Sequence, residues 1–580
     1  MKTEITEQRL TGLGVSEGIR IGRAFVYKPL KLEDIKESKT EQPDQELARL
    51  EQAKAQCVVE LNALIERAKQ TLGEEKAAIL KGQVSFLSDP AFYPPMQKLI
   101  QTEQWSAEAA VKRIVNQVAG LFEAMASEYM RERAADIRDV GTRLMTQLVG
   151  HQGARLSDIT SEVIIVADDL TPSDTVQLDK QYVLGFVTRI GGKTSHTAIL
   201  ANSLGIAAIL GLGEAIEKIR HGEEMIIDGS TGECVLHPAE FTKEAFAAAF
   251  AAEQLEQESL QAYRDLAAVT KDGFAFEIAA NIGTPQEAAG LLEKGAEAIG
   301  LYRTEFLFMS TSQMPSEEIQ FKAYRQAAEA MQGRPVVIRT LDIGGDKELP
   351  YLQLPEEMNP FLGYRAIRLC LDQKQLFLTQ LRAIIRAGAY GNVKIMFPMI
   401  SGMDEWRQAK ALYEEAREQL INEGASIGEA IEIGIMIEIP SAALIADRLA
   451  KEVDFFSIGT NDLVQYTVAV DRMNEKVSYL YDYFHPAVLQ LIKTVIDASN
   501  KHGKWTGMCG SMAGDPLAAP LLAGLGLHEW SMSPTAVHRI KQTVRKLDRS
   551  ACVQLTERLL DMDTPAEIRS ELAAFLKLEQ

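Results

Sequence analysis

The pattern of apolar and polar positions changes along the chain and predicts several structurally different parts. Residues 8–30 contain short β-like segments, and residues 160–238 contain apolar runs such as 163–167 that predict buried strands. Between them, residues 45–83 contain no proline, and both this stretch and residues 107–145 repeat apolar residues at helical spacing. Because the early β segments have no sheet of their own, we expect them to join the later sheet. The helical bundle would then be an insertion into an α/β domain.

The pattern changes again after residue 239. Residues 241–269 are rich in Ala, Glu and Gln without Gly or Pro, and they predict one linker helix of up to about 40 Å. Beyond Gly273, apolar runs that predict buried strands alternate with helical segments, and the runs are 276–282, 298–302, 335–341, 393–398, 433–439, 455–458, 505–508 and 529–532. Eight βα units in about 310 residues favour a closed (β/α)8 barrel, with an open doubly wound sheet as the alternative.

The chain is therefore expected to be a multidomain α/β protein. The predicted parts are an α/β domain at 1–31 and 149–238, an inserted helical domain at 32–148, a linker helix at 239–269, and a barrel at 270–580. The helical insertion shows no metal-ligand spacing and no glycine-rich phosphate loop. A purely structural bundle and a docking module therefore both remain open.

Composition restricts the compartment and the partners. The formal net charge of −20 argues against a nucleic-acid-binding protein and favours a basic protein partner. The five cysteines are scattered without CxxC spacing, which indicates neither a disulfide framework nor a zinc site. The N-terminus lacks an apolar leader, and no run of 18 apolar residues occurs. We expect a cytoplasmic protein without membrane insertion.

A histidine near the start of a predicted helix is the first candidate for chemistry. Gly191 and Gly192 predict a turn after a strand, and Thr194 or Ser195 predicts a helix cap, which places His196 in the first helical turn. The unpaired N–H groups of a helix N-terminus favour a neutral imidazole and would bind an anionic group attached to it. These properties suit a phosphorylated histidine, and the alternative is a surface or capping histidine.

Polar residues follow several predicted barrel strands, and barrel enzymes carry their chemistry at these ends. The residues are Arg303, Arg339, Lys347, Glu438, Asn461, Asp462, Arg472 and Cys509. Arginines bind phosphate and carboxylate groups bidentately, and two carboxylates beside substrate oxygens suit Mg²⁺. This set predicts a site for a small phosphorylated and carboxylated anion held with a metal, with salt bridges among the same residues as the alternative. The sequence leaves open whether Cys509 is an acid or a nucleophile.

Several stretches together resemble enzyme I of the bacterial sugar phosphotransferase system. They are GGKTSH at 191–196, YRTEF at 302–306, RTLDIGGDK at 339–347, NPFLGYR at 359–365, GTNDLVQYTVAVDR at 459–472 and the residues at 508–515. The resemblance covers essentially the whole chain, including the helical insertion and the linker helix. Dikinases and phosphoenolpyruvate synthases share the histidine and barrel units but also carry an ATP-grasp domain, for which this chain has no room.

The resemblance implies a reaction and a role for each candidate residue. Phosphoenolpyruvate (PEP) would phosphorylate His196 at Nε2 and release pyruvate, and Cys509 would protonate the enolate of pyruvate. Glu438 and Asp462 would bind Mg²⁺. The PEP-binding positions implied by the family are Arg303, Arg339, Asn461, Asp462 and Arg472, with Lys347 on the loop over the phosphate.

The family also implies partners. The phosphoryl group would pass from His196 in the α/β domain, a phosphohistidine domain, to the histidine phosphocarrier protein, as the first step of sugar uptake. The helical insertion resembles the docking site for this basic carrier, and Glu74, Glu75 and Leu87 are candidate contacts. Family members form a homodimer through the barrel domain.

The chain departs from the family pattern at three positions. Ser511 stands where the family commonly has Glu, Lys193 replaces the commoner Arg, and Glu17 replaces the usual Pro. The change at Ser511 removes a carboxylate near the Cys509 thiol and supports an alternative, a catalytically impaired regulatory paralogue that still binds the phosphocarrier. A dikinase-like enzyme that uses ATP is a further alternative.

Overall fold

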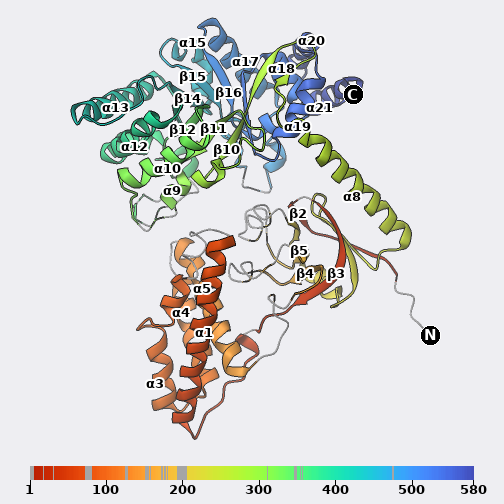
Figure 1. Ribbon diagram of the computed structural model, residues 1–580, viewed down its shortest axis with the longest axis vertical. Helices are drawn as coiled ribbons and strands as arrows, with labels where there is room; N and C mark the ends of the chain where they lie inside the picture. Colours follow the sequence, from red (N-terminus) through yellow and green to blue (C-terminus); the bar gives the residue numbers. More distant parts are fainter. Residues whose placement is uncertain are drawn as a thin grey trace. The chain divides into compact units, whose positions relative to one another are not determined.

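The computed structural model divides into two compact units, Met1–Leu255 and Glu256–Gln580 (Figure 1). The structure describes residues 6–579 except for 17, 31, 72–80, 124–127, 151–155, 157–158, 171–173, 175–177, 179–180, 192–196, 198–200, 202–205, 310, 312, 345–348, 350, 353, 356, 473 and 475. Among the helices it describes, none combines the length and the apolar character that crossing a lipid bilayer requires.

The first unit contains an eight-stranded mixed sheet with the spatial order β1-β8-β7-β3-β4-β5-β6-β2. Its strands are Gln8–Thr11 (β1), Leu13–Ser16 (β2), Ile19–Tyr27 (β3), Val163–Ala167 (β4), Val183–Thr188 (β5), Ala207–Leu210 (β6), Glu224–Asp228 (β7) and Glu233–Leu236 (β8). Strand β3 pairs in parallel with β4 and antiparallel with β7. The prediction that the first β segments join the later sheet is therefore confirmed.

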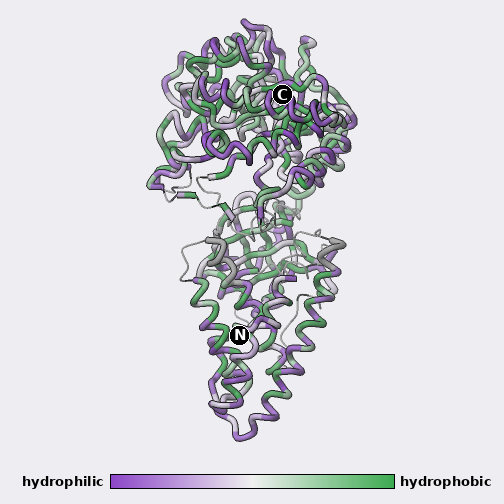
Figure 2. The backbone as a smooth tube through the Cα atoms, turned by 90° about the vertical axis from the view of Figure 1, so that its left-hand side faces the viewer, coloured by the Kyte–Doolittle hydropathy of each residue, from purple (hydrophilic) through white to green (hydrophobic). Residues whose placement is uncertain are grey.

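A bundle of helices lies between β3 and β4 in the sequence. Its helices are Pro43–Thr71 (α1), Tyr93–Glu103 (α3), Ala107–Glu123 (α4) and Glu128–Val149 (α5). Their buried faces form one apolar core that includes Leu50, Leu61, Val111 and Leu144. Figure 2 shows hydrophobic and hydrophilic stretches alternating along these helices, as expected for helices that bury one face.

The predicted helical stretch over residues 107–145 forms two helices, α4 and α5, which pack against each other as expected for a bundle. A Cβ added at Gly141 on α5 would lie 2.5 Å from the side chain of Val115 on α4, so the two backbones approach closely. Arg138 on α5 pairs with Glu123 on α4 at 2.8 Å. Helical periodicity continues through the stretch because both helices bury apolar residues in the same core.

The linker helix is shorter than the sequence predicts. Helix α8 spans Glu240–Gln261, and the division between the units falls within it, after Leu255. Residues Ala268–Val269 form a short strand, β9, in which Ala268 is buried and pairs with Phe276. The strand pairing outweighs the helical propensity of this Ala-rich segment, because propensity is weak compared with tertiary packing.

The second unit is a closed barrel of parallel strands (Figure 1). The strands are Ala275–Ile282 (β10), Ala298–Arg303 (β11), Val336–Arg339 (β12), Val393–Phe397 (β13), Ile433–Ile437 (β14), Phe455–Ile458 (β15), Trp505–Met508 (β16) and Glu529–Met532 (β17). Each strand pairs with the next, and β17 pairs in parallel with β10, which closes the barrel. All eight predicted strands are confirmed, and the open-sheet alternative is wrong.

Helices follow the barrel strands and surround them in Figure 1. They are Glu305–Met309 (α9), Glu317–Ala330 (α10), Ile367–Asp372 (α11), Lys374–Ala387 (α12), Met403–Asn422 (α13), Pro440–Leu444 (α14), Ala446–Leu449 (α15), Thr460–Val468 (α16), Pro486–Lys501 (α17), Ala519–Leu525 (α18), Val537–Lys546 (α19), Arg549–Leu560 (α20) and Pro565–Glu579 (α21). Residues from several strands form a separate buried cluster, Leu301, Val337, Met396, Met436, Phe455 and Cys509. Three of its members, Leu301, Met436 and Cys509, also line the cavity described next.

Candidate active site

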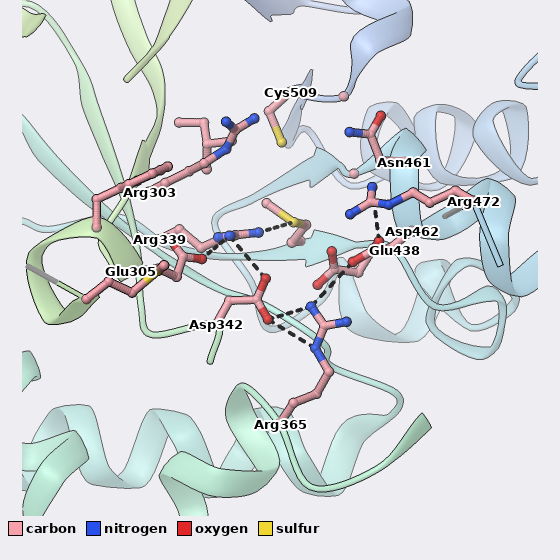
Figure 3. A pocket seen from close by; sticks show the side chains of 16 residues that line it. Arg303, Glu305, Arg339, Asp342, Arg365, Glu438, Asn461, Asp462, Arg472 and Cys509 are labelled. Atoms are coloured by element: carbon pink, nitrogen blue, oxygen red, sulfur yellow. Dashed lines mark hydrogen bonds and ion pairs between the residues drawn. The ribbon is translucent and has the colours of Figure 1, made fainter. Parts of the chain in front are cut away.

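A cavity of about 330 Å³ opens at the carboxyl ends of the barrel strands (Figure 3). Parallel strands all point the same way, so residues that follow different strands meet at one rim. The described residues predicted for the barrel site all line this cavity: Arg303, Arg339, Glu438, Asn461, Asp462, Arg472 and Cys509. Lys347 and His196 lie outside the described residues, as do Glu74 and Glu75.

Arg339, the last residue of β12, is buried among carboxylates. Its Nη2 contacts Glu305 Oε1 and lies 3.1 Å from Asp342 Oδ2, while its Nη1 lies 3.7 Å from the sulfur of Met436. Its Nε is buried and has no hydrogen-bond partner among the described residues. Arg339 therefore forms salt bridges, as the alternative interpretation expected. Its partners, Glu305 and Asp342, are not among the predicted site residues.

Arg303, the last residue of β11, differs from Arg339. Its guanidinium forms neither an ion pair nor a hydrogen bond with any residue that the structure describes. Burial, and then the neighbouring Arg339 charge, lower the pKa of Arg303. A partly buried cation in this position is suited to an anionic ligand, whose charge would compensate for the lost hydration.

Two buried carboxylates, Glu438 and Asp462, follow strands β14 and β15. Glu438 Oε1 accepts a hydrogen bond from the backbone N–H of Met399 at 2.6 Å. Asp462 Oδ1 lies 3.6 Å from Arg472 Nη1 and is buried without a hydrogen bond from any described residue. Burial, and then the charges of Asp462 and Asp342, raise the pKa of Glu438 well above its usual range.

This pair of carboxylates fits a divalent cation. Burial first, and then repulsion from the neighbouring carboxylates, disfavour the ionised form of Glu438, and a bound cation would stabilise that form. The described residues contain no group of three or more His, Cys, Asp or Glu side chains suited to a metal. Two carboxylates suit Mg²⁺, which completes its octahedral oxygen ligands with water and substrate.

Cys509 follows β16 and is almost completely buried. Its thiol donates to the carbonyl oxygen of Ile458, with Sγ and O 3.8 Å apart, and its own carbonyl accepts from Asn281 Nδ2 at 3.0 Å. Burial raises the pKa of the Cys509 thiol to about 11. The thiol is therefore protonated at neutral pH, which favours an acid over a nucleophilic thiolate and narrows a choice that the sequence left open.

Comparisons with known proteins agree with this geometry. Residues 257–549 match the family described as PEP-utilising enzyme, PEP-binding domain, and residues 11–133 and 159–232 match its N-terminal and mobile domains. The chain is 49% identical over 572 residues to phosphoenolpyruvate-protein phosphotransferase of Geobacillus stearothermophilus, covering 98% of each chain. The chain belongs to the phosphoenolpyruvate-protein phosphotransferase family. The resemblance seen in the sequence is thereby confirmed.

Other members of the phosphotransferase family show the same extent of similarity. The phosphoenolpyruvate-protein phosphotransferase of Bacillus subtilis (strain 168) is 49% identical, covering 98% of this chain and 99% of that one. That of Staphylococcus carnosus (strain TM300) is also 49% identical, covering 97% of this chain and 98% of that one. The match to the PEP-binding domain includes every described residue that lines the cavity.

Three charged residues of the cavity in this phosphotransferase family member had no role in the sequence analysis: Glu305, Asp342 and Arg365. Arg365 Nη2 lies 2.7 Å from Asp342 Oδ1 and 3.6 Å from Asp462 Oδ2, so it links the third and sixth loops. Glu305 comes two residues after Arg303, and Asp342 comes three residues after Arg339. This short separation in sequence could have identified both as residues of the site. No local signal places Arg365 beside Asp462.

The segment that contains His196 is described only at its edges. Gly191 has a φ of 124°, which supports the predicted glycine turn before it. Thr197 is buried, and its hydroxyl donates to Asp169 Oδ1 at 3.0 Å in the loop after β4. The residue that follows His196 is therefore held to the loop after β4 by a side-chain hydrogen bond.

One expected docking contact needs correction. Leu87 is fully buried in the core of the helical bundle, where it packs among residues of the surrounding helices. A side chain without exposed surface cannot contact a partner protein. Its apolar character reflects the packing of the bundle. The sequence alone could not distinguish this buried position from a position in an exposed apolar patch.

Proposed function

We propose that this chain phosphorylates its own His196 from PEP, releases pyruvate, and passes the phosphoryl group to the histidine phosphocarrier protein. The observation that carries the proposal is the convergence of four arginines, four buried carboxylates and a thiol of raised pKa on one cavity at the barrel rim. The names of the relatives, which cover nearly the whole chain, support the same reaction.

The arginines and the start of α16 would bind the anionic substrate. Arg303 and Arg472 project into the cavity with Arg339 (Figure 3), and guanidinium groups bind phosphate and carboxylate oxygens in pairs. Gly459 and Asn461 line the cavity where α16 begins, so the positive end of that helix adds to the field. We place Lys347 on the third loop in the same role.

Glu438 and Asp462 would hold Mg²⁺, with Arg365 and Arg472 keeping Asp462 in place from either side. When bound, the cation supplies positive charge to the phosphoryl oxygens. The two carboxylates follow adjacent strands, β14 and β15. Both side chains are buried, which limits their movement.

The reaction breaks the bond between the phosphorus and the enol oxygen of PEP, and a bond forms from phosphorus to Nε2 of His196. The electron pair stays on the leaving oxygen, and Cys509 gives its proton to C3, which yields pyruvate; the thiolate then recovers a proton from solvent. The cations around the cavity stabilise the charge on the transferring group, which is most of what phosphoryl transfer requires. Protonation at carbon makes the transfer favourable.

We further propose that residues 1–31 and 149–238 form the phosphohistidine domain and that residues 32–148 dock the phosphocarrier, with residues 239–269 linking them to the barrel at 270–580. Exposed apolar side chains on the barrel, among them Leu362, Leu444 and Tyr479, support a homodimer through that domain. The five cysteines are all free and buried, which supports a reducing compartment and thus the cytoplasm.

Labelled PEP with Mg²⁺ tests the proposal. We expect label on the wild-type chain and on the control His221→Ala, which removes an exposed histidine of the same unit, and none on His196→Ala. Label that persists in His196→Ala would overturn the assignment. Absence of label on a wild-type chain that still binds the phosphocarrier would favour the impaired regulatory paralogue, and labelling that requires ATP would favour a dikinase.

A further inference from the structure

Ser511 and Asn461 come from neighbouring loops and meet at the cavity rim. Ser511 begins the short helix after β16, and Asn461 lies in the first turn of α16 after β15. The backbone N–H of Ser511 donates to Asn461 Oδ1 at 3.1 Å, and the Ser511 hydroxyl donates to the same oxygen at 2.9 Å. Two donors from one residue therefore act on one atom of the Asn461 amide.

These two hydrogen bonds determine which way the amide faces. A backbone N–H can only donate, so the atom 3.1 Å away must be the carboxamide oxygen. The amide nitrogen of Asn461, with its two N–H groups, is then the group left for a ligand. Figure 3 shows this nitrogen on the side of Cys509 and Arg303, with the oxygen directed away from them, and Asn461 lines the cavity.

Close backbone contact holds the two loops in this arrangement. A Cβ added at Gly510 would lie 1.8 Å from Thr460 Oγ1 and 2.6 Å from Thr460 N, so only glycine fits between Cys509 and Ser511. The backbone N–H of Cys509 also donates to the carbonyl of Ile458 at 3.1 Å. Ser511 thus reaches Asn461 from a firmly placed backbone, and its hydroxyl carries no charge that would repel an anion.

We infer that Ser511 is a positioning residue for PEP: it fixes the amide of Asn461 so that its N–H groups face the anionic substrate. This inference rests on the proposed function. Without the hydroxyl, one of two restraints on the amide is lost, and the amide populates orientations that present its oxygen to the anion. Because Ser511 is exposed, removing its hydroxyl leaves no buried polar group unpaired, and we expect the fold to be unaffected.

The test measures PEP affinity by calorimetry in the His196→Ala background, where bound PEP cannot transfer its phosphoryl group. We expect Ser511→Ala to raise the Kd about fivefold, and Ser511→Thr, which keeps the hydroxyl, to retain the parent value. Asn461→Ala should weaken binding at least as much, and adding Ser511→Ala to it should change nothing further. Ser533→Ala, an exposed serine after β17 whose hydroxyl contacts Thr535, is the matched control.

Each result has a distinct meaning. An unchanged Kd for PEP in Ser511→Ala would overturn the inference but not the proposed function. The same would follow if Ser511→Ala weakened PEP binding equally with Asn461 and with Asn461→Ala. A lowered unfolding temperature that accounts for the loss would assign Ser511 a merely structural role and would also overturn it. If the parent chain binds no PEP, the proposed function itself falls, and the inference falls with it.

Discussion

The sulfur of Cys509 lies 3.8 Å from the carbonyl oxygen of Ile458, to which the thiol donates. Because burial raises the pKa of Cys509 to about 11, we expect the thiol to react slowly with iodoacetamide at pH 8. The rate should then increase about tenfold per pH unit up to about pH 11, since only the thiolate reacts. Peptide mass spectrometry of timed samples measures this rate at Cys509 itself. A rate that stops rising below pH 9 would contradict the assignment of Cys509 as an acid.

Arg303 and Arg339 should differ in what their loss does to the barrel. Arg303→Ala should weaken PEP binding by about 10- to 100-fold without destabilising the fold, because Arg303 forms no ion pair with a described residue. Arg339→Ala should also lower stability by on the order of 3 kcal/mol, because it removes the cation that Glu305 and Asp342 contact. Urea unfolding measures the stability of both variants, and PEP titration measures their affinity for PEP. Equal destabilisation by the two substitutions would contradict this account.

Glu438→Gln should have opposite effects on metal binding and on the metal-free barrel. It should lower the affinity for Mn²⁺, a stand-in for Mg²⁺ observable by electron paramagnetic resonance. It should also raise the unfolding temperature without metal, because the pKa of Glu438 is raised by burial and by nearby carboxylates, so its charge is costly at neutral pH.

Glu432→Gln is the matched control for Glu438→Gln. Glu432 precedes the same strand at its other end, and its carboxylate pairs with Lys394 at 2.8 Å. The Lys394 and Trp505 hydrogen bonds outweigh burial and lower the pKa of Glu432, so its neutral variant should be slightly less stable with unchanged Mn²⁺ affinity. The same change in metal affinity for both variants would count against a metal site at Glu438.

Glu529, at the first position of β17, predicts a pH dependence of barrel stability. Burial, and then the charge of Glu277 on β10, raise the pKa of Glu529 from 4.5 to about 8. The folded barrel therefore binds this proton more tightly than the unfolded chain. The resulting stability is fully present below about pH 4.5 and is lost as the pH rises toward 8, by a few kcal/mol in order of magnitude.

Urea unfolding of the wild type and of Glu529→Gln between pH 5 and 9 measures this dependence. The variant should lose less stability than the wild type as the pH rises, so that the two profiles diverge across this window. Glu293→Gln, which replaces an exposed glutamate, should follow the wild type. Parallel profiles for wild type and Glu529→Gln would show that this group does not titrate in the folded barrel.

Much of the fold could be predicted because the barrel strands are continuous apolar runs, buried on both faces and separated by helices. The errors occurred where two structures share one pattern. Ala268 lies in an Ala-rich segment that predicts a helix, although it pairs with Phe276 in a strand. Leu87 reads equally well as a core residue or as a surface contact.

The sequence by itself determined which residues stand at the strand ends, and therefore the family and most of the charged and polar side chains that line the cavity, because strand order in a barrel follows chain order. Only the tertiary structure decided the pKa, the ion pairs and the orientation of these side chains. Burial raises the pKa of the Cys509 thiol, Arg365 reaches Asp462 from a distant loop, and the Ser511 hydroxyl donates to Oδ1 of Asn461. These properties depend on burial and on charges and hydrogen bonds between loops far apart in the chain, which no local pattern of residues encodes.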